Sequence, residues 1–159
     1  MKMSGFNYYW LLFMALAGFA CSDEDPPAPT ITMDPQEAEI TMTNSGMTSW
    51  IFTEVKGNDV SLSINDPNAQ ITLRSGKRYS FFNLGGPTHP LDFRDKDGKL
   101  LLTQDDEKGL FEDNEDVNFV VNLDDDLVAF TLTPELAAAL ATYNCSAHTV
   151  MEGVIVIIE

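Results

Sequence analysis

Two short segments, far apart in the chain, hold the residues best suited to chemistry. The segment GGPTHPLDF contains His89, and the segment YNCSAHTVMEGVIVI contains Cys145, His148 and Met151 at a spacing of three residues. They include both histidines and one of the two cysteines of the 159-residue chain. A thiolate, two imidazoles and a thioether are ligands for a soft or borderline metal ion. The pattern therefore predicts a metal site that joins the two segments.

Copper is the metal that fits this set of donors best. Two nitrogens and a thiolate with a weak thioether accept both Cu(I) and Cu(II), and a rigid scaffold keeps the geometry similar in the two states. Structural zinc would want a fourth cysteine or histidine, and catalytic zinc rarely has a methionine beside it. A cysteine–histidine hydrolase is conceivable, but a histidine three residues after the nucleophile is poorly placed as its general base. We therefore expect one copper ion and no enzyme activity.

The rest of the chain predicts a β-sheet scaffold for this site. Nine short segments of alternating polarity or β-rich composition are separated by Gly, Asn, Asp and Pro. They read SWIFTEV, VSLSI, AQITLRSG, RYSFFNL, PLDFRD, KLLLTQ, VNFVVNL, LVAFTLT and GVIVIIE. This number of short strands predicts an all-β domain, either a sandwich or a barrel.

One segment, TPELAAALATY, has the pattern of a short helix that leads into Tyr143. Thr133 can cap its beginning, Pro134 suits the first helical position, and Glu135 lies near the positive end of the helix. An Ala- and Leu-rich run follows. We expect this helix to stand directly before the segment that carries Cys145.

The N-terminal segment predicts export. After Lys2, the apolar run Phe6–Ala20 is too short to span a bilayer comfortably, and Cys21 follows at once. Small residues at Gly18 and Ala20 suit a signal peptidase, and the segment resembles a bacterial lipobox in which Gly18 stands where leucine is usual. Ordinary secretion after cleavage at Ala20 is the alternative.

The following stretch, CSDEDPPAP, resembles the acidic tether of lipoproteins sent to the outer membrane surface. We therefore expect a signal peptide in residues 1–20, a lipidated Cys21 with an acidic Pro-rich linker in residues 21–42, and one domain in residues 43–159. A lipid anchor would place that domain at the outer membrane, on the periplasmic or the cell-surface side.

Charge and cysteine count restrict the partners. A net charge of −16 argues against nucleic acid or anionic lipid as a partner. If Cys21 carries a lipid, Cys145 is an unpaired thiol in an oxidising compartment, which favours metal ligation. A disulfide between the two cysteines is the alternative, although a bridge to a Pro-rich leader would constrain little.

The C-terminal segment resembles the copper loop of the cupredoxins, the family of plastocyanin, azurin and amicyanin. An aromatic residue two before the cysteine, then C-x2-H-x2-M, a glycine and a last strand is their short-loop pattern. The segment GKRYSFFNLGGPTHPLDF resembles their strand, loop and first ligand histidine. The resemblance covers roughly Thr43 to Glu159. It implies a Greek-key sandwich or barrel with His89, Cys145 and His148 as equatorial ligands and Met151 as the axial ligand.

The same resemblance implies a mononuclear type 1 copper protein that transfers electrons. Its partner would be a redox protein such as a c-type cytochrome or an oxidase domain. The partner would dock on an apolar patch around His148 that includes Leu84, Pro87 and Val150. Two alternatives remain: a copper protein for storage or delivery, and a metal-free module of this fold for adhesion or assembly.

Pro90 departs from the pattern of plastocyanin-like sequences, which usually have asparagine after the first histidine. The backbone N–H of that asparagine points at the cysteine sulfur, and proline has no N–H to give. We expect more negative charge on the sulfur of Cys145 and a lower potential, unless another donor replaces this bond.

Overall fold

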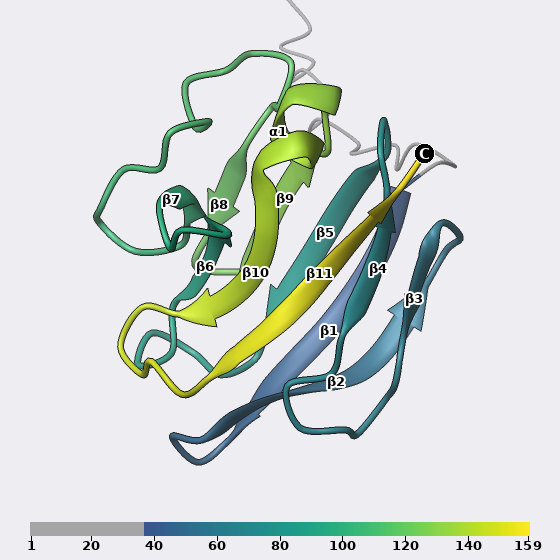
Figure 1. The fold of residues 1–159 in the computed structure, drawn as a ribbon. Coiled ribbons are helices and arrows are strands. Elements are labelled where there is room, and N and C mark those ends of the chain that lie inside the picture. The colour runs from purple at the N-terminus through teal and green to yellow at the C-terminus, as the bar shows by residue number, and fades with distance from the viewer. Residues whose placement is uncertain (1–36) are drawn as a thin grey trace, which may run out of the picture. The chain divides into compact units, whose positions relative to one another are not determined.

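Two mixed β-sheets make up residues 37–159, the part of the chain that the computed structural model describes (Figure 1). The five-stranded sheet has the order β2-β1-β5-β9-β8, and the six-stranded sheet has the order β3-β4-β11-β10-β6-β7. One pair in each sheet is parallel, β1 with β5 and β4 with β11. The strands are β1 (Glu37–Ser45), β2 (Ser49–Lys56), β3 (Val60–Leu62), β4 (Ile71–Arg74), β5 (Arg78–Asn83), β6 (Leu91–Asp95), β7 (Leu100–Thr103), β8 (Val120–Asn122), β9 (Leu127–Thr131), β10 (Leu140–Cys145) and β11 (Glu152–Ile158).

The two sheets pack face to face through aromatic side chains. Phe93 of β6 contacts Phe81 of β5 and Phe130 of β9, with ring centroids 5.1 and 4.9 Å apart. Phe52 of β2 contacts Tyr143 of β10 at 5.2 Å. These five residues are fully buried, and each contact joins one sheet to the other. The fold is therefore an all-β sandwich, as the strand pattern predicted, and each of the nine predicted segments contains a strand.

The predicted helix is right at its beginning and wrong at its end. Helix α1 spans Pro134–Ala139, and the side chain of Thr133 accepts a hydrogen bond from the backbone N–H of Leu136. Leu140 is already extended, and β10 runs from there to Cys145. The backbone of β10 pairs with β6 on one side and β11 on the other. Sheet pairing on both sides overrides the local helix preference of this Ala-rich run.

The predicted domain boundary at residue 43 is six residues too late, because β1 begins at Glu37. In this strand Ala38, Ile40 and Met42 are buried at alternate positions, so they belong to the core. The predicted signal peptide, Cys21 and most of the predicted linker lie outside the described residues. Within residues 37–159, no helix has the length and apolar character needed to cross a membrane.

The connections between strands place three loops at one end of the domain. Figure 1 shows α1 at one end and the β1–β2, β5–β6 and β10–β11 connections at the opposite end. Hydrogen bonds join these connections: the backbone N–H of Ser146 donates to the carbonyl of Pro90 at 3.1 Å, and Asn44 lies 3.1 Å from the ring of His89. This end of the sandwich carries the residues singled out by the sequence.

Candidate metal site

The side chains of His89, Cys145 and His148 converge at this end of the sandwich. Nδ1 of His89 lies 3.8 Å from Sγ of Cys145, and Nδ1 of His148 lies 3.5 Å from the same sulfur. The two imidazole rings have centroids 4.7 Å apart. One ligand atom from each residue lies within 4.8 Å of the others, so one metal ion can reach all three. No other group of His, Cys, Asp or Glu within residues 37–159 meets this condition.

His89 is held by the loop between β5 and β6. Its backbone N–H donates to the carbonyl of Gly86 at 3.0 Å, and its own carbonyl accepts a hydrogen bond from Nδ2 of Asn83 at 2.7 Å. The same amide of Asn83 donates to Oε1 of Gln104, which also accepts the backbone N–H of Leu91. The loop is therefore fixed by a buried amide network rather than by apolar packing alone.

Cys145 is the last residue of β10, and its register against β6 brings it beside His89. Cys145 pairs with Leu91, two residues after His89. The chain then turns tightly, because the backbone N–H of Cys145 donates to the carbonyl of Met151 and that of Met151 donates to the carbonyl of His148, both at 3.0 Å. This closed turn keeps His148 close to the thiol.

Met151 lies at the end of the same turn and is fully buried. Its backbone is fixed by the two hydrogen bonds that close the turn. Its side chain is part of the hydrophobic core of the sandwich. Its role as an axial ligand stays a prediction.

The environment of the cluster favours neutral forms of its residues. Burial raises the pKa of the Cys145 thiol, which the nearby carboxylates of Asp92 and Asp105 raise further. Burial, together with the neighbouring His148, lowers the pKa of His89. A neutral imidazole can bind a metal ion through its unprotonated nitrogen, whereas the thiol must first lose its proton.

Two backbone donors face the sulfur of Cys145. The N–H groups of Ala147 and His148 hydrogen-bond to it and lower its pKa, against the larger effect of burial. Pro90 was expected to lower the potential unless another donor replaced its missing N–H. These two N–H groups are such donors. Pro90 contributes instead through its carbonyl, which accepts the backbone N–H of Ser146.

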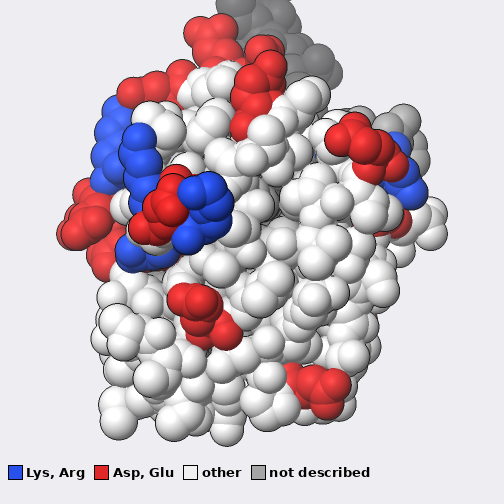
Figure 2. Space-filling model, viewed as in Figure 1, with Lys and Arg blue, Asp and Glu red and all other residues white. Residues whose placement is uncertain are grey.

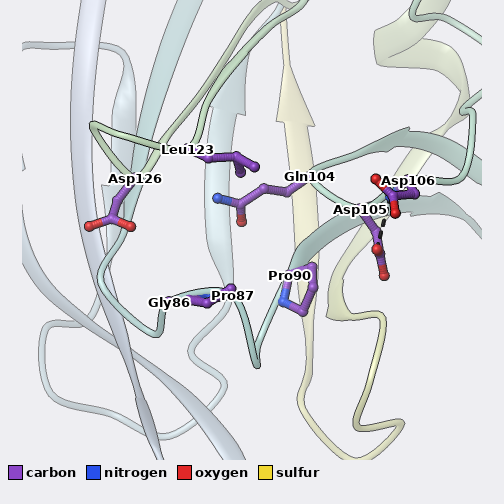
Figure 3. Close-up of a pocket in the computed structure, with 8 residues that line it drawn as sticks. All are labelled: Gly86, Pro87, Pro90, Gln104, Asp105, Asp106, Leu123 and Asp126. Carbon is purple, nitrogen blue, oxygen red and sulfur yellow. Dashed lines mark hydrogen bonds between the residues drawn. The ribbon is translucent and has the colours of Figure 1, made fainter.

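A cavity of about 270 Å³ lies against the loop that carries His89 (Figure 3). In the close-up, Asp105 and Asp106 lie on one side and Asp126 on the other, with Pro90 between them. Oδ2 of Asp105 accepts a hydrogen bond from the hydroxyl of Ser146 at 2.8 Å. The loop that carries His89 therefore contributes both to the cavity and to the metal cluster. The lining of the cavity consists of Gly86, Pro87, Pro90, Gln104, Asp105, Asp106, Leu123 and Asp126.

Two neighbours of His89 were missed by the sequence analysis. Nδ2 of Asn44 lies 3.1 Å from Nε2 of His89, and the buried ring of Trp50 meets the His89 ring edge-on, with centroids 6.3 Å apart. The indole N–H of Trp50 has no hydrogen-bond partner within the described part of the chain. Asn44 and Trp50 are opposite each other on β1 and β2, so strand register brings both to the site.

Comparison of the chain with family models, curated proteins and solved structures finds no match. Two imidazole nitrogens and one sulfur suit zinc, copper, iron or nickel by donor type, with the sulfur favouring soft ions such as Cu(I). Hydrogen bonds hold the main chain of both loops, so the backbone of the three residues needs little rearrangement to bind a metal ion.

Proposed function

We propose that the chain is a mononuclear copper protein of the cupredoxin type that transfers electrons. The observation that carries the proposal is the approach of both Nδ1 atoms to one sulfur, at 3.8 and 3.5 Å, in a buried cluster. In this proposal His89, Cys145 and His148 hold the ion, and Met151 is its axial ligand. Copper would supply the one-electron change between Cu(I) and Cu(II). The two mixed sheets are compatible with the Greek-key arrangement of that family.

The hydrogen-bonded turns favour electron transfer over simple storage of metal. A site that keeps one geometry in two oxidation states needs little rearrangement when an electron passes. Here Asn83 ties the His89 loop to β5, and the main-chain bonds between Cys145, His148 and Met151 close the other loop. Such rigidity is not needed by a protein that only stores or delivers copper.

The surface near His148 suits a redox partner. His148 is half-buried, and Leu84, Pro87 and Val150 are exposed on the two loops that carry the ligands. Figure 2 shows that charged residues gather mainly toward the other end of this face, while few lie at the end of the β10–β11 connection. We place the docking site of a c-type cytochrome or an oxidase domain on this patch. The proposed lipid anchor at Cys21 would hold the domain at the outer membrane.

A visible spectrum after addition of Cu(II) to the purified protein tests the proposal. A thiolate ligand to Cu(II) gives a strong charge-transfer band, so the protein should turn blue or green and bleach on reduction. Cys145→Ser should abolish the band, and Cys21→Ser, the matched control on the other cysteine, should leave it intact. Stoichiometric copper without colour would refute electron transfer and favour storage or delivery. Failure to bind copper would favour a metal-free module.

A further inference from the structure

The two ring nitrogens of His89 face different partners. Nδ1 lies 3.8 Å from Sγ of Cys145, whereas Nε2 lies 3.1 Å from Nδ2 of Asn44. A hydrogen bond at one nitrogen of an imidazole fixes the direction of the other. We propose that Asn44 is a positioning residue that turns Nδ1 of His89 toward Cys145 and determines which ring nitrogen carries the proton.

Strand geometry explains how Asn44 reaches the site. Ile40 and Met42 are fully buried at alternate positions of β1, and Asn44 is the next residue in this inward-facing series. Its register partner on β2 is Trp50, which is fully buried and contacts the same ring of His89. An amide therefore stands where the series otherwise has apolar residues, and its polar atoms meet the histidine.

The amide of Asn44 has little freedom to move away from His89. Its Nδ2 also donates to the carbonyl of Gly46 at 2.8 Å. On its other side a side-chain carbon added to Gly85 would lie 3.2 Å from Oδ1 of Asn44 and 3.3 Å from Cβ of His89. The amide is thus enclosed by the turn after β1, the backbone of Gly85 and the ring that it positions.

The donors and acceptors at this contact determine where the ring proton of His89 lies. In the metal-free arrangement Nδ2 of Asn44 faces Nε2 of His89, so Nε2 accepts and the ring proton lies on Nδ1. A neutral imidazole that binds a metal ion through Nδ1 carries its proton on Nε2 and needs an acceptor there. Rotation of the amide supplies Oδ1 as that acceptor, at the loss of the bond to Gly46. This step rests on the proposed metal site, whereas the positioning of the metal-free ring does not.

The test begins with the metal-free full chain. Long-range ¹H–¹⁵N correlation spectra at pH 8 distinguish the two proton positions of each imidazole, and the chain has only two histidines to assign. Wild type should carry the His89 proton on Nδ1. Asn44→Asp keeps the shape but can only accept a hydrogen bond, so the proton should move to Nε2, and Asn44→Ala should give a mixture.

A control in the same turn separates positioning from general support. The hydroxyl of Thr48 donates to the carbonyl of Ser45 rather than to His89, so Thr48→Ala should leave the His89 signals as in wild type. His148 serves as an internal reference in every spectrum. If Asn44→Asp and Asn44→Ala leave the His89 proton where wild type has it, the proposal is overturned.

A second measurement uses Zn²⁺, which binds without redox chemistry. Removing a hydrogen-bond partner of a ligating histidine weakens metal binding by about 10- to 100-fold. Asn44→Ala should show a loss of this size, whereas Asn44→Asp should bind at least as tightly as wild type and Thr48→Ala should match it. An equal loss in Asn44→Ala and Thr48→Ala would refute a positioning role. If wild type binds no metal, the proposed function fails, while the metal-free spectra still decide on Asn44.

Discussion

Metal affinity should rise steeply with pH, because the thiol of Cys145 must lose a proton to become a ligand. Burial raises the pKa of this thiol and lowers that of His89, so at pH 7 the cysteine is protonated and the histidine is neutral. Binding therefore releases one proton from the thiol. As long as the pH is below the pKa of the thiol, each increase of one pH unit strengthens binding about tenfold, or about 1.4 kcal/mol.

The size of the increase in metal affinity reports how far burial shifts the pKa of the Cys145 thiol. With an ordinary cysteine pKa of about 8.5, affinity would grow only about 25-fold between pH 7 and pH 9, because the thiol would be mostly ionised at the end of the range. With a pKa raised well above 9, the growth approaches about 100-fold. Burial of Cys145, which raises the pKa of the thiol, predicts an increase larger than about 25-fold.

Competition between the protein and a chelator of known pH dependence, with Zn²⁺ as the ion, measures this slope. Cys145→Ser is the matched control, since a serine hydroxyl does not ionise in this range, and its affinity should change little with pH. An unchanged affinity in wild type, or an equal slope in Cys145→Ser, would refute the reasoning, because either result would mean that the metal binds without this thiolate.

The same shifts predict the opposite trend for the stability of the metal-free domain. A thiol whose pKa is raised on folding stabilises the fold below its unfolded value of about 8.5, and this contribution is lost as pH rises through the folded value. His89, whose pKa is lowered, contributes above about 6.5 and loses its contribution as pH falls through the folded value. Urea midpoints measured with reductant and chelator should therefore be highest between these limits, and a continued rise above pH 9 would contradict the assignment.

Four further changes have defined outcomes. Gly153→Ala should destabilise the domain by about 1–3 kcal/mol or more in urea titration, because the added carbon would overlap the ring of Tyr143. Equal stability would mean that the two strands can separate freely. Asp92→Asn should lower the free energy of unfolding by about 1–3 kcal/mol, because this buried carboxylate accepts hydrogen bonds from Arg94 and Thr103, both at 2.6 Å. An unchanged urea midpoint would show that the charge is dispensable. Met151→Leu should raise the copper potential in voltammetry and keep the colour, and no shift would mean that Met151 is not a ligand. Cys21→Ser should abolish fatty-acid labelling without loss of the copper site, and persistent label would refute the lipobox assignment.

The strands were predictable because their signal is local. In Ile71–Arg74, for example, buried and less buried residues follow the alternation that the sequence already displays. The beginning of α1 was predictable for the same reason, since Thr133 and Pro134 are cap residues in adjacent positions. Local rules of this kind do not depend on which strands become neighbours.

The errors arose where distant pairing decides the structure. The run from Leu140 to Cys145 begins with residues that favour a helix, but it lies between β6 and β11 and takes its conformation from them. The first residues of β1 resemble the acidic leader in composition, and only their pairing with β2 and β5 makes them a strand. Neither partner is visible from the segment itself.

The same distinction applies to the site. His89, Cys145 and His148 could be proposed as ligands because their side chains are rare in this chain and chemically matched. Asn44 could not, because its meeting with His89 depends on the parallel pairing of β1 with β5, which places Met42 opposite Asn83. An amide in an inward position of an alternating strand was the available signal, and it needed a known sheet order to be interpreted.

The bonds that hold the cluster lie mostly among residues that are not ligands. Asn83 and Gln104 fix the loop of His89, and Ser146 ties the loop of Cys145 to Pro90 through its N–H and to Asp105 through its hydroxyl. Each loop is thus fastened to the β-sandwich independently of any metal ion. A ligand set that is arranged before binding imposes its own geometry on the ion, and this property suits a site that must keep one shape in two oxidation states.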